Sequence, residues 1–156
     1  MQTSSVMEAP QVENLILANH VEALNGLLYI SGGGWTDHWR PAAANPSQPV
    51  VSHLGIGVTV MVPWTVIGTP LPLTVAIEDP VGNQVAGLAT QLNSTRPSGL
   101  PTGADLRTVL ALSLNLVFPK AGEYRVVATL AGQLPRTVDF RVHDVAPPAP
   151  MQPTVN

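Results

Sequence analysis

The residue types most able to do chemistry lie together in the segment YISGGGWTDHWRP. Five of its residues are candidates for contact with a ligand or a partner: Trp35, Asp37, His38, Trp39 and Arg40. Aromatic faces beside a few polar groups bind carbohydrates and other small planar molecules. In such a site the two tryptophans would stack on the ligand, Asp37 and His38 would contact it through hydrogen bonds, and Arg40 would bind an anion.

The same segment has a second interpretation, in which it packs on protein. The three glycines, Gly32–Gly34, let the backbone turn sharply away from the strand before them. Trp35 would then pack into the chain's own core, and Trp39, in an alanine- and proline-rich stretch, would contribute to a subunit contact. The triple glycine does not indicate a phosphate loop, because neither the lysine nor the following helix is present. The sequence leaves both interpretations open.

The remaining polar residues give little support to metal binding or catalysis. Histidine ligands usually include a close pair such as H-x-x-x-H, whereas His20, His38 and His53 stand in separate segments. Ser52 and His53, with Asp79 elsewhere in the chain, lack the glycine motif that surrounds a nucleophile. We therefore expect no metal ion, no cofactor and no enzymatic activity.

The charge content restricts the partners. Only 11% of the 156 residues are charged, and the net charge is −3, whereas about 25% is typical of soluble domains. So few charges favour self-association, which removes surface from water. The six arginines and one lysine are scattered, without the basic patch that a phosphate backbone needs. We expect self-association or another protein partner, and no nucleic acid.

Signals for export or membrane insertion are not visible. The first residues lack the positive region and apolar run of a secretory signal. No stretch approaches the roughly 18 apolar residues that cross a bilayer. Cysteine is absent, so disulfides cannot form. We expect a cytoplasmic protein without membrane contact.

The elements that must position these residues are β-strands, because apolar residues recur with a period of two. The clearest alternation falls in five segments: residues 56–62, 73–77, 110–118, 124–130 and 138–142. Near the N-terminus, residues 14–20 and 26–31 predict a hairpin around residues 22–25. Turns that contain glycine or proline separate the later strands.

The pattern predicts an all-β fold, an immunoglobulin-like antiparallel β-sandwich of seven or eight strands with long loops. Residues 36–48 and 93–105 are expected to be long loops, because they are rich in small residues and proline. We expect residues 1–12 to be a flexible N-terminal segment and 13–144 to form the β-sandwich domain. Residues 145–156, VAPPAPMQPTVN, are expected to be a proline-rich disordered tail.

Three stretches have a pattern in common with a known family: GLLYISGGGW at 26–35, LPLTVAIEDPVGN at 71–83 and AGEYRVVATLAGQLPRTVDFRV at 121–142. They resemble an uncharacterised bacterial family, largely actinobacterial, of small β-sandwich domains of unknown function. The resemblance covers most of residues 14–143 and implies a β-sandwich without assigned catalytic residues. Separately, GEYRV at 122–126 resembles the G-x-Y-x-V of the penultimate strand in immunoglobulin-like domains, whose tyrosine packs across the sandwich end.

The expected function is that of a non-catalytic interaction or structural module that self-associates. The alternative is a small-ligand binding domain, for a carbohydrate or a planar molecule, that uses the loop Trp35–Arg40. Tryptophans that are buried in the chain or in a symmetric contact would favour the module. An open cleft with Trp39 exposed beside Asp37 and His38 would favour the ligand-binding domain.

Overall fold

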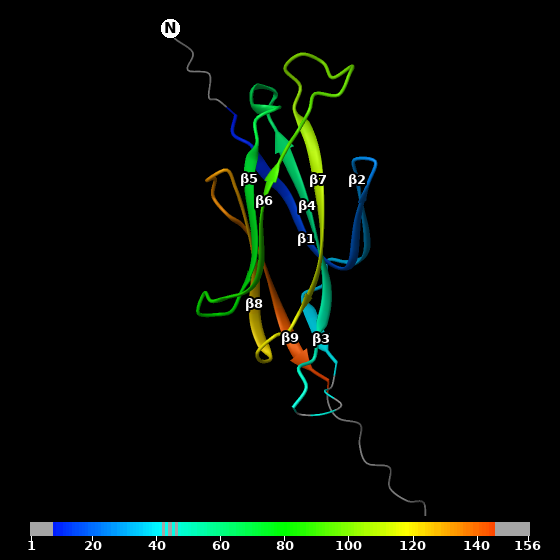
Figure 1. Cartoon of the computed structure of the whole chain (residues 1–156), viewed down its shortest axis with the longest axis vertical. Coiled ribbons are helices and arrows are strands. Elements are labelled where there is room, and N and C mark those ends of the chain that lie inside the picture. Colours follow the sequence, from blue (N-terminus) through cyan, green and yellow to red (C-terminus); the bar gives the residue numbers. More distant parts are fainter. Residues whose placement is uncertain (1–7, 42, 44, 46, 146–156) are drawn as a thin grey trace, which may run out of the picture.

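The chain folds as a β-sandwich, seen in the computed structural model of Figure 1, which describes residues 8–41, 43, 45 and 47–145. A single turn of 3-10 helix, η1 (Trp64–Val66), interrupts the strands of this described part. The strands are β1 (Gln11–Leu24), β2 (Leu27–Gly33), β3 (Asp37–Arg40), β4 (Ser52–Val62), β5 (Leu71–Glu78), β6 (Gln84–Leu92), β7 (Leu106–Leu116), β8 (Gly122–Leu130) and β9 (Arg136–Asp144). No helix in the described residues is long and apolar enough to span a membrane.

Two sheets form the layers of the sandwich. The first has the strand order β2-β1-β4-β7, and the second has the order β3-β9-β8-β5-β6. The pairs are antiparallel except for β3, which runs parallel to β9. The predicted all-β sandwich is confirmed, with nine strands in the described residues where seven or eight were expected.

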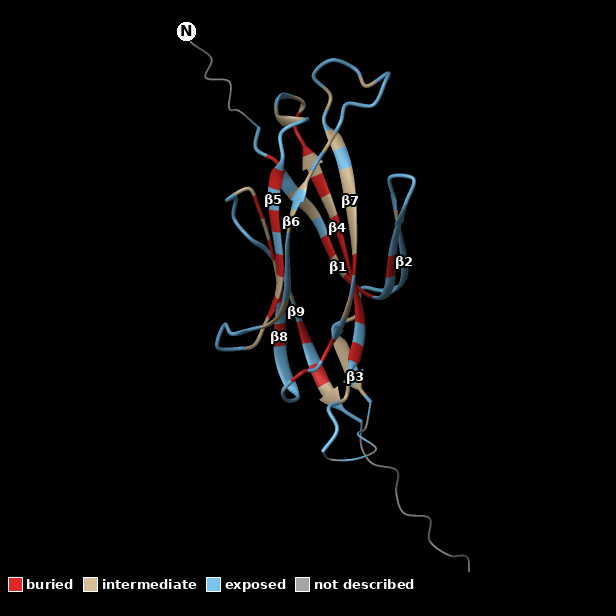
Figure 2. Cartoon of the chain, in the orientation of Figure 1, coloured by how far each residue is buried: buried red, intermediate tan, exposed pale blue. Residues whose placement is uncertain are grey.

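The hydrophobic core lies between the two sheets, and its buried residues are red on the ribbon in Figure 2. The predicted alternation places the core side chains correctly in β4, β5 and β8. Their fully or nearly fully buried members are Ile56, Val58, Val60, Val62, Leu73, Val75, Ile77, Tyr124, Val126, Ala128 and Leu130. In β7, Leu112 and Leu116 are buried, whereas Leu110 and Leu114 are only partly covered. The strand β7 lies at the edge of its sheet, and its core-facing row is covered less completely than that of its neighbour β4.

The strand β1 is long because it takes part in two pairings. Its first half pairs with β4, and from Ala18 onward it pairs with β2. The hairpin turns at Asn25 and Gly26, whose φ angles of 51° and 75° are both positive, as a two-residue type I′ turn requires. The predicted hairpin is therefore present, but its turn is later than the expected residues 22–25.

The β1–β2 hairpin folds back over the outer face of the first sheet, beside β7 in Figure 1. Two glycines of β4 make room for it. A side chain on Gly57 would meet the Leu28 side chain at 2.8 Å, and one on Gly55 would meet the backbone nitrogen of Val21 at 3.0 Å. Val21 and Leu28 thus lie on the hairpin face that covers the sheet.

Tyr124 closes one end of the sandwich. Its hydroxyl donates a hydrogen bond to the carbonyl oxygen of Lys120 at 2.6 Å, and its ring contacts Phe118 and Phe140. A buried tyrosine that bonds back to the backbone just upstream is the tyrosine corner of immunoglobulin-like sandwiches.

The expected loops and ends are partly corrected. Residues 93–105 contain no strand, as predicted, but residues 36–48 are not all loop, because β3 lies within them. Two residues of the expected N-terminal segment 1–12 belong to β1, which begins at Gln11. Residues 1–7, and the expected tail beyond Val145, lie outside the described residues.

Candidate functional site

The candidate residues lie on β3 or directly before it. This four-residue strand forms the edge of the second sheet, with Asp37 opposite Arg141 and Trp39 opposite His143. The backbone N–H of Arg141 donates to the carbonyl oxygen of Thr36 at 2.8 Å. Because side chains alternate along a strand, Asp37 and Trp39 lie on one face of β3.

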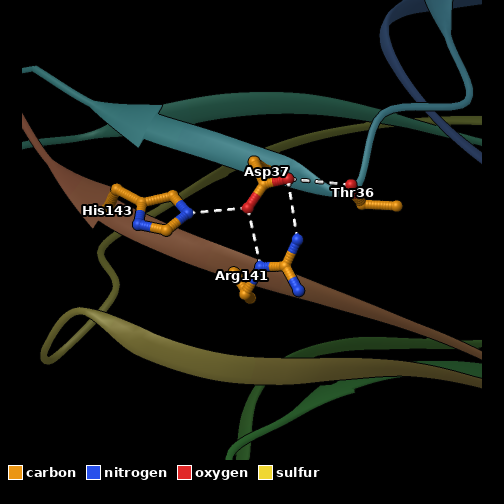
Figure 3. A network of polar contacts seen from close by, with 4 residues as sticks. All are labelled: Thr36, Asp37, Arg141 and His143. Carbon is orange, nitrogen blue, oxygen red and sulfur yellow. Dashed lines mark hydrogen bonds and ion pairs between the residues drawn. The ribbon is translucent and has the colours of Figure 1, made fainter.

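A network of polar contacts centred on Asp37 holds β3 against β9 (Figure 3). Arg141 donates from Nε at 2.7 Å and from Nη2 at 3.0 Å to the two carboxylate oxygens. Nε2 of His143 lies 2.7 Å from Oδ1, and Thr36 donates its hydroxyl to Oδ2 at 2.8 Å. The hydrogen bonds from Arg141 first, and those of His143 and Thr36 next, hold the pKa of the Asp37 carboxyl far below its usual range.

Replacing Arg141 with glutamine is expected to raise the pKa of Asp37 toward the ordinary aspartate value of about 4. A carboxyl whose folded-state pKa is lowered stabilises the fold above its ordinary pKa, and this contribution disappears as the pH falls through the lowered value. Carbon NMR of the side-chain carboxyls, recorded from neutral to acid pH, measures the shift. Arg107→Gln is the matched control, because Arg107 forms a similar bidentate pair with Glu13. An unchanged Asp37 pKa in Arg141→Gln would contradict the assignment.

Trp35 and His38 turn toward the interior. The Trp35 ring packs edge-on against Phe140, with centroids 5.8 Å apart, and lies 5.6 Å from the His38 ring. Trp35 belongs to the side chains packed on the core, as the second interpretation expected. Burial lowers the pKa of His38, which favours the neutral ring. Nε1 of Trp35 and Nε2 of His38 are buried without a hydrogen-bond partner among the described residues.

Trp39 lies in the opposite direction, on the surface. Its side chain is 60% exposed and stacks on the His143 ring, with centroids 4.5 Å apart and planes inclined by 25°. Arg40 forms an ion pair with Asp144 and donates from Nη1 to the carbonyl oxygen of Phe118 at 2.9 Å. Arg40 is therefore bonded to groups of its own chain and not held ready for an anionic ligand.

The five candidates therefore do not converge on one pocket. Trp35 packs on the core and His38 contacts the buried Phe118 ring, while Asp37 is bonded to three neighbours. The part that remains open to another molecule is the free face of the Trp39 ring, held by His143.

Next to this ring, charged side chains cover the outer face of β8 and β9. Arg125 of β8 forms an ion pair with Asp139 of β9 at 2.6 Å. Asp139 lies two residues before Arg141 on the same face of β9, so this ion pair is adjacent to that of Arg141 with Asp37. These two arginines and Glu78 line an open hollow of about 480 Å³. No group of three or more metal-ligating side chains gathers in the described part of the chain.

The residues considered for catalysis have local contacts. Ser52 is buried, and Nδ1 of His53 lies 2.9 Å from Oδ1 of Asn115. The Asp79 carboxylate accepts hydrogen bonds from the backbone N–H groups of Val81 and Asn83. These contacts orient a turn and a strand pair, and none of them couples Ser52 to a base.

A second surface, which the sequence interpretation missed, is the outward face of the β1–β2 hairpin. Val21 and Leu28 cover the sheet, so alternation places Leu24, Leu27 and Tyr29 on the opposite face. Their exposed fractions are 52%, 59% and 51%. The signal was present in the sequence LLYISGG of β2, which has neither a charge nor a proline.

Comparison with known proteins places the chain in a family. The model of the Family of unknown function (DUF6941) matches residues 13–143, and the chain belongs to this family. The match confirms the predicted resemblance to a family of unknown function over nearly the range expected from the sequence. No curated protein matches the chain.

Proposed function

We propose that this protein is a non-catalytic interaction module that self-associates by pairing β2 of two copies edge to edge. The observation that carries the proposal is that β2, an edge strand of seven residues, has no charge and no proline and exposes large apolar side chains. Its outer row of backbone N–H and C=O groups has no neighbouring strand among the described residues. Such an edge pairs readily with another strand.

Other edges are less suited to pairing. The edge strand β3 is only four residues long and carries Asp37 and Arg40, and charges of this kind protect an edge. The edge strand β6 is also uncharged, but Leu88 is the only large apolar side chain that it exposes. The edge strand β7 carries Arg107 and exposes no large apolar side chain. The strand β2 therefore combines an open edge with the most apolar surface.

Pairing of two β2 strands around a two-fold axis would join the hairpins into one four-stranded sheet. A two-fold contact uses the same patch on both copies, and strand addition supplies main-chain hydrogen bonds. Leu27 and Tyr29 of one copy would then lie beside the same residues of the other, forming a continuous apolar strip. Cross-strand contacts between aromatic and aliphatic side chains stabilise such a pair.

Replacing Tyr29 with lysine is expected to convert the associated protein into a monomer, because the two-fold axis brings the new positive charges together. Sedimentation velocity measures the mass of the parent and the variant at matched concentrations. Leu88→Lys is the matched control, since it places the same charge on an exposed apolar position of the uncharged edge strand β6. We expect the control to keep the mass of the parent.

Two results would count against the proposal. A parent chain that sediments as a monomer at every concentration would contradict self-association through any surface. A Tyr29→Lys variant that keeps the parent mass while Leu88→Lys loses it would move the contact to β6.

Binding of a carbohydrate or planar ligand at Trp35–Arg40 is the second candidate function. It is supported by the exposed Trp39 ring beside Asp37. It is weakened because Thr36, Arg141 and His143 already bond to Asp37, and because His38 faces the core. The cytoplasmic location, the actinobacterial distribution and the immunoglobulin-like domain type also stay proposals, the last supported by the Tyr124 corner.

A further inference from the structure

We propose that the Trp39–His143 surface is a binding site for the proline-rich segment 146–153 of a second copy of this chain. The proposal deepens the self-association proposed above, on which it rests, by naming a segment that one copy gives to the other. It is carried by the geometry of the Trp39 ring and by the spacing of the prolines.

The Trp39 ring is held in place before any ligand arrives. Arg141 fixes the Asp37 carboxylate, Asp37 bonds to Nε2 of His143, and the His143 ring stacks under Trp39. One face of the indole is thereby covered, and the rest of this 60% exposed side chain stays open to solvent. A rigid aromatic anchor loses little conformational freedom when a partner binds, which favours affinity.

The segment APPAPMQP has the spacing that such a surface recognises. Of its four prolines, those at positions 147, 150 and 153 are three residues apart, so the pattern P-x-x-P occurs twice in succession. A polyproline II helix has three residues per turn, and these three prolines would form one apolar face. Proline-rich segments of this kind dock on aromatic-lined surfaces.

The hydrogen-bonding groups also match. Proline offers a carbonyl acceptor and no N–H donor, so a proline-rich ligand needs donors on the receiving surface. Nε and Nη2 of Arg141 serve Asp37, which leaves Nη1 as a donor, since no bond to it occurs among the described residues. The segment carries no charge. The receiving surface needs no charged ligand, because the charges of Asp37 and Arg141 neutralise each other.

The occupant comes from a second copy because the chain's own segment starts too close. Trp39 lies opposite His143, and the segment begins at residue 146. A return to Trp39 would require a reversal within about three residues. Ala146, Pro147 and Ala149 each precede a proline, and a residue in that position is restricted to extended conformations. Once two copies are paired through β2, the second contact gains from a high effective concentration.

The test uses the full chain with Pro147, Pro150 and Pro153 changed to serine, titrated with a synthetic peptide of residues 145–156. Calorimetry measures the affinity, and a peptide with the same three serines is the negative control. Adding Trp39→Ala to the chain is expected to weaken peptide binding at least about tenfold, as for an anchor residue of an interface. Trp64→Ala is the matched control, because Trp64 is a tryptophan on another surface, covered by Arg96, and should leave the affinity unchanged.

The outcomes separate this inference from the edge pairing. Equal peptide affinity with and without Trp39, or no saturable binding up to about 1 mM peptide, would overturn the inference. The pairing through β2 would be unaffected by these results, because it is tested separately by the mass of the Tyr29→Lys variant. Peptide binding by a parent chain that stays monomeric would overturn the second copy as occupant. Binding that requires Trp39 and the three prolines, in a chain that self-associates, is the result that we expect.

Discussion

Replacing Trp35 with alanine is expected to lower the free energy of unfolding by about 3–5 kcal/mol, the range for a large aromatic removed from a packed site. The ring lies edge-on against Phe140 and beside His38, so its removal leaves a cavity at the sandwich end. Urea denaturation, followed by far-ultraviolet circular dichroism, measures the change. Trp39→Ala is the matched control and should cost less than about 1 kcal/mol, because most of that side chain is already in water.

Equal losses for the two tryptophan variants would contradict this assignment of roles. A loss below about 1 kcal/mol for Trp35→Ala would mean that the ring contributes no more than a surface side chain. Either result would also weaken the argument that the glycines before Trp35 let it reach the core.

Replacing Leu112 with alanine is expected to cost about 2–5 kcal/mol, as for other buried leucines. Leu112 lies opposite Ile56 in β4, and both side chains are buried between the sheets. Leu114 is the matched control, since it occupies the same face of β7 but is only partly buried. The sequence pattern predicts the same cost at both positions, whereas the structure predicts the smaller cost at Leu114. A larger loss of unfolding free energy for Leu114→Ala than for Leu112→Ala would place the centre of this core nearer the C-terminal end of β7.

The core strands could be predicted because their apolar residues alternate over five or more positions. Val58 and Val60, for example, face the same side in any extended chain, and a sandwich buries that side. The hairpin near the N-terminus was also predictable, but the turn required attention to the pair Asn25-Gly26. This dipeptide is favoured where both central residues have positive φ, and the predicted turn two residues earlier overlooked it.

The strand β3 could not be predicted from its own residues. The sequence DHWR has no apolar alternation, and four residues are too few for a period to appear. Its partner β9 lies about a hundred residues later in the chain, and the pairing is parallel. No hairpin turn in the sequence therefore indicates that the two strands pair. The strand forms because Asp37 meets Arg141 and His143, and because Trp39 stacks on His143.

The candidate site shows the same limit. The segment of residues 35–40 was identified from residue types alone, but Arg141 and His143 were not grouped with it, because only the parallel pairing brings them together. The opposite directions of Trp35 and Trp39 also follow from the strand and its entry, not from composition. The open edge of β2 was missed as well, although the sequence LLYISGG lacks the charges and the proline that protect an edge strand. That β2 lies at an edge follows only from the strand order of the sheet.

Amide hydrogen exchange, measured at low and at high protein concentration, tests the pairing of β2 most directly. Exchange slows where a backbone N–H gains a hydrogen-bond partner. If two copies pair through this edge, alternate amides of β2 become protected as the concentration rises, while the amides of the edge strand β6 exchange at the same rate throughout. Exchange from β2 that is independent of concentration, or protection that appears on β6 instead, would contradict the account.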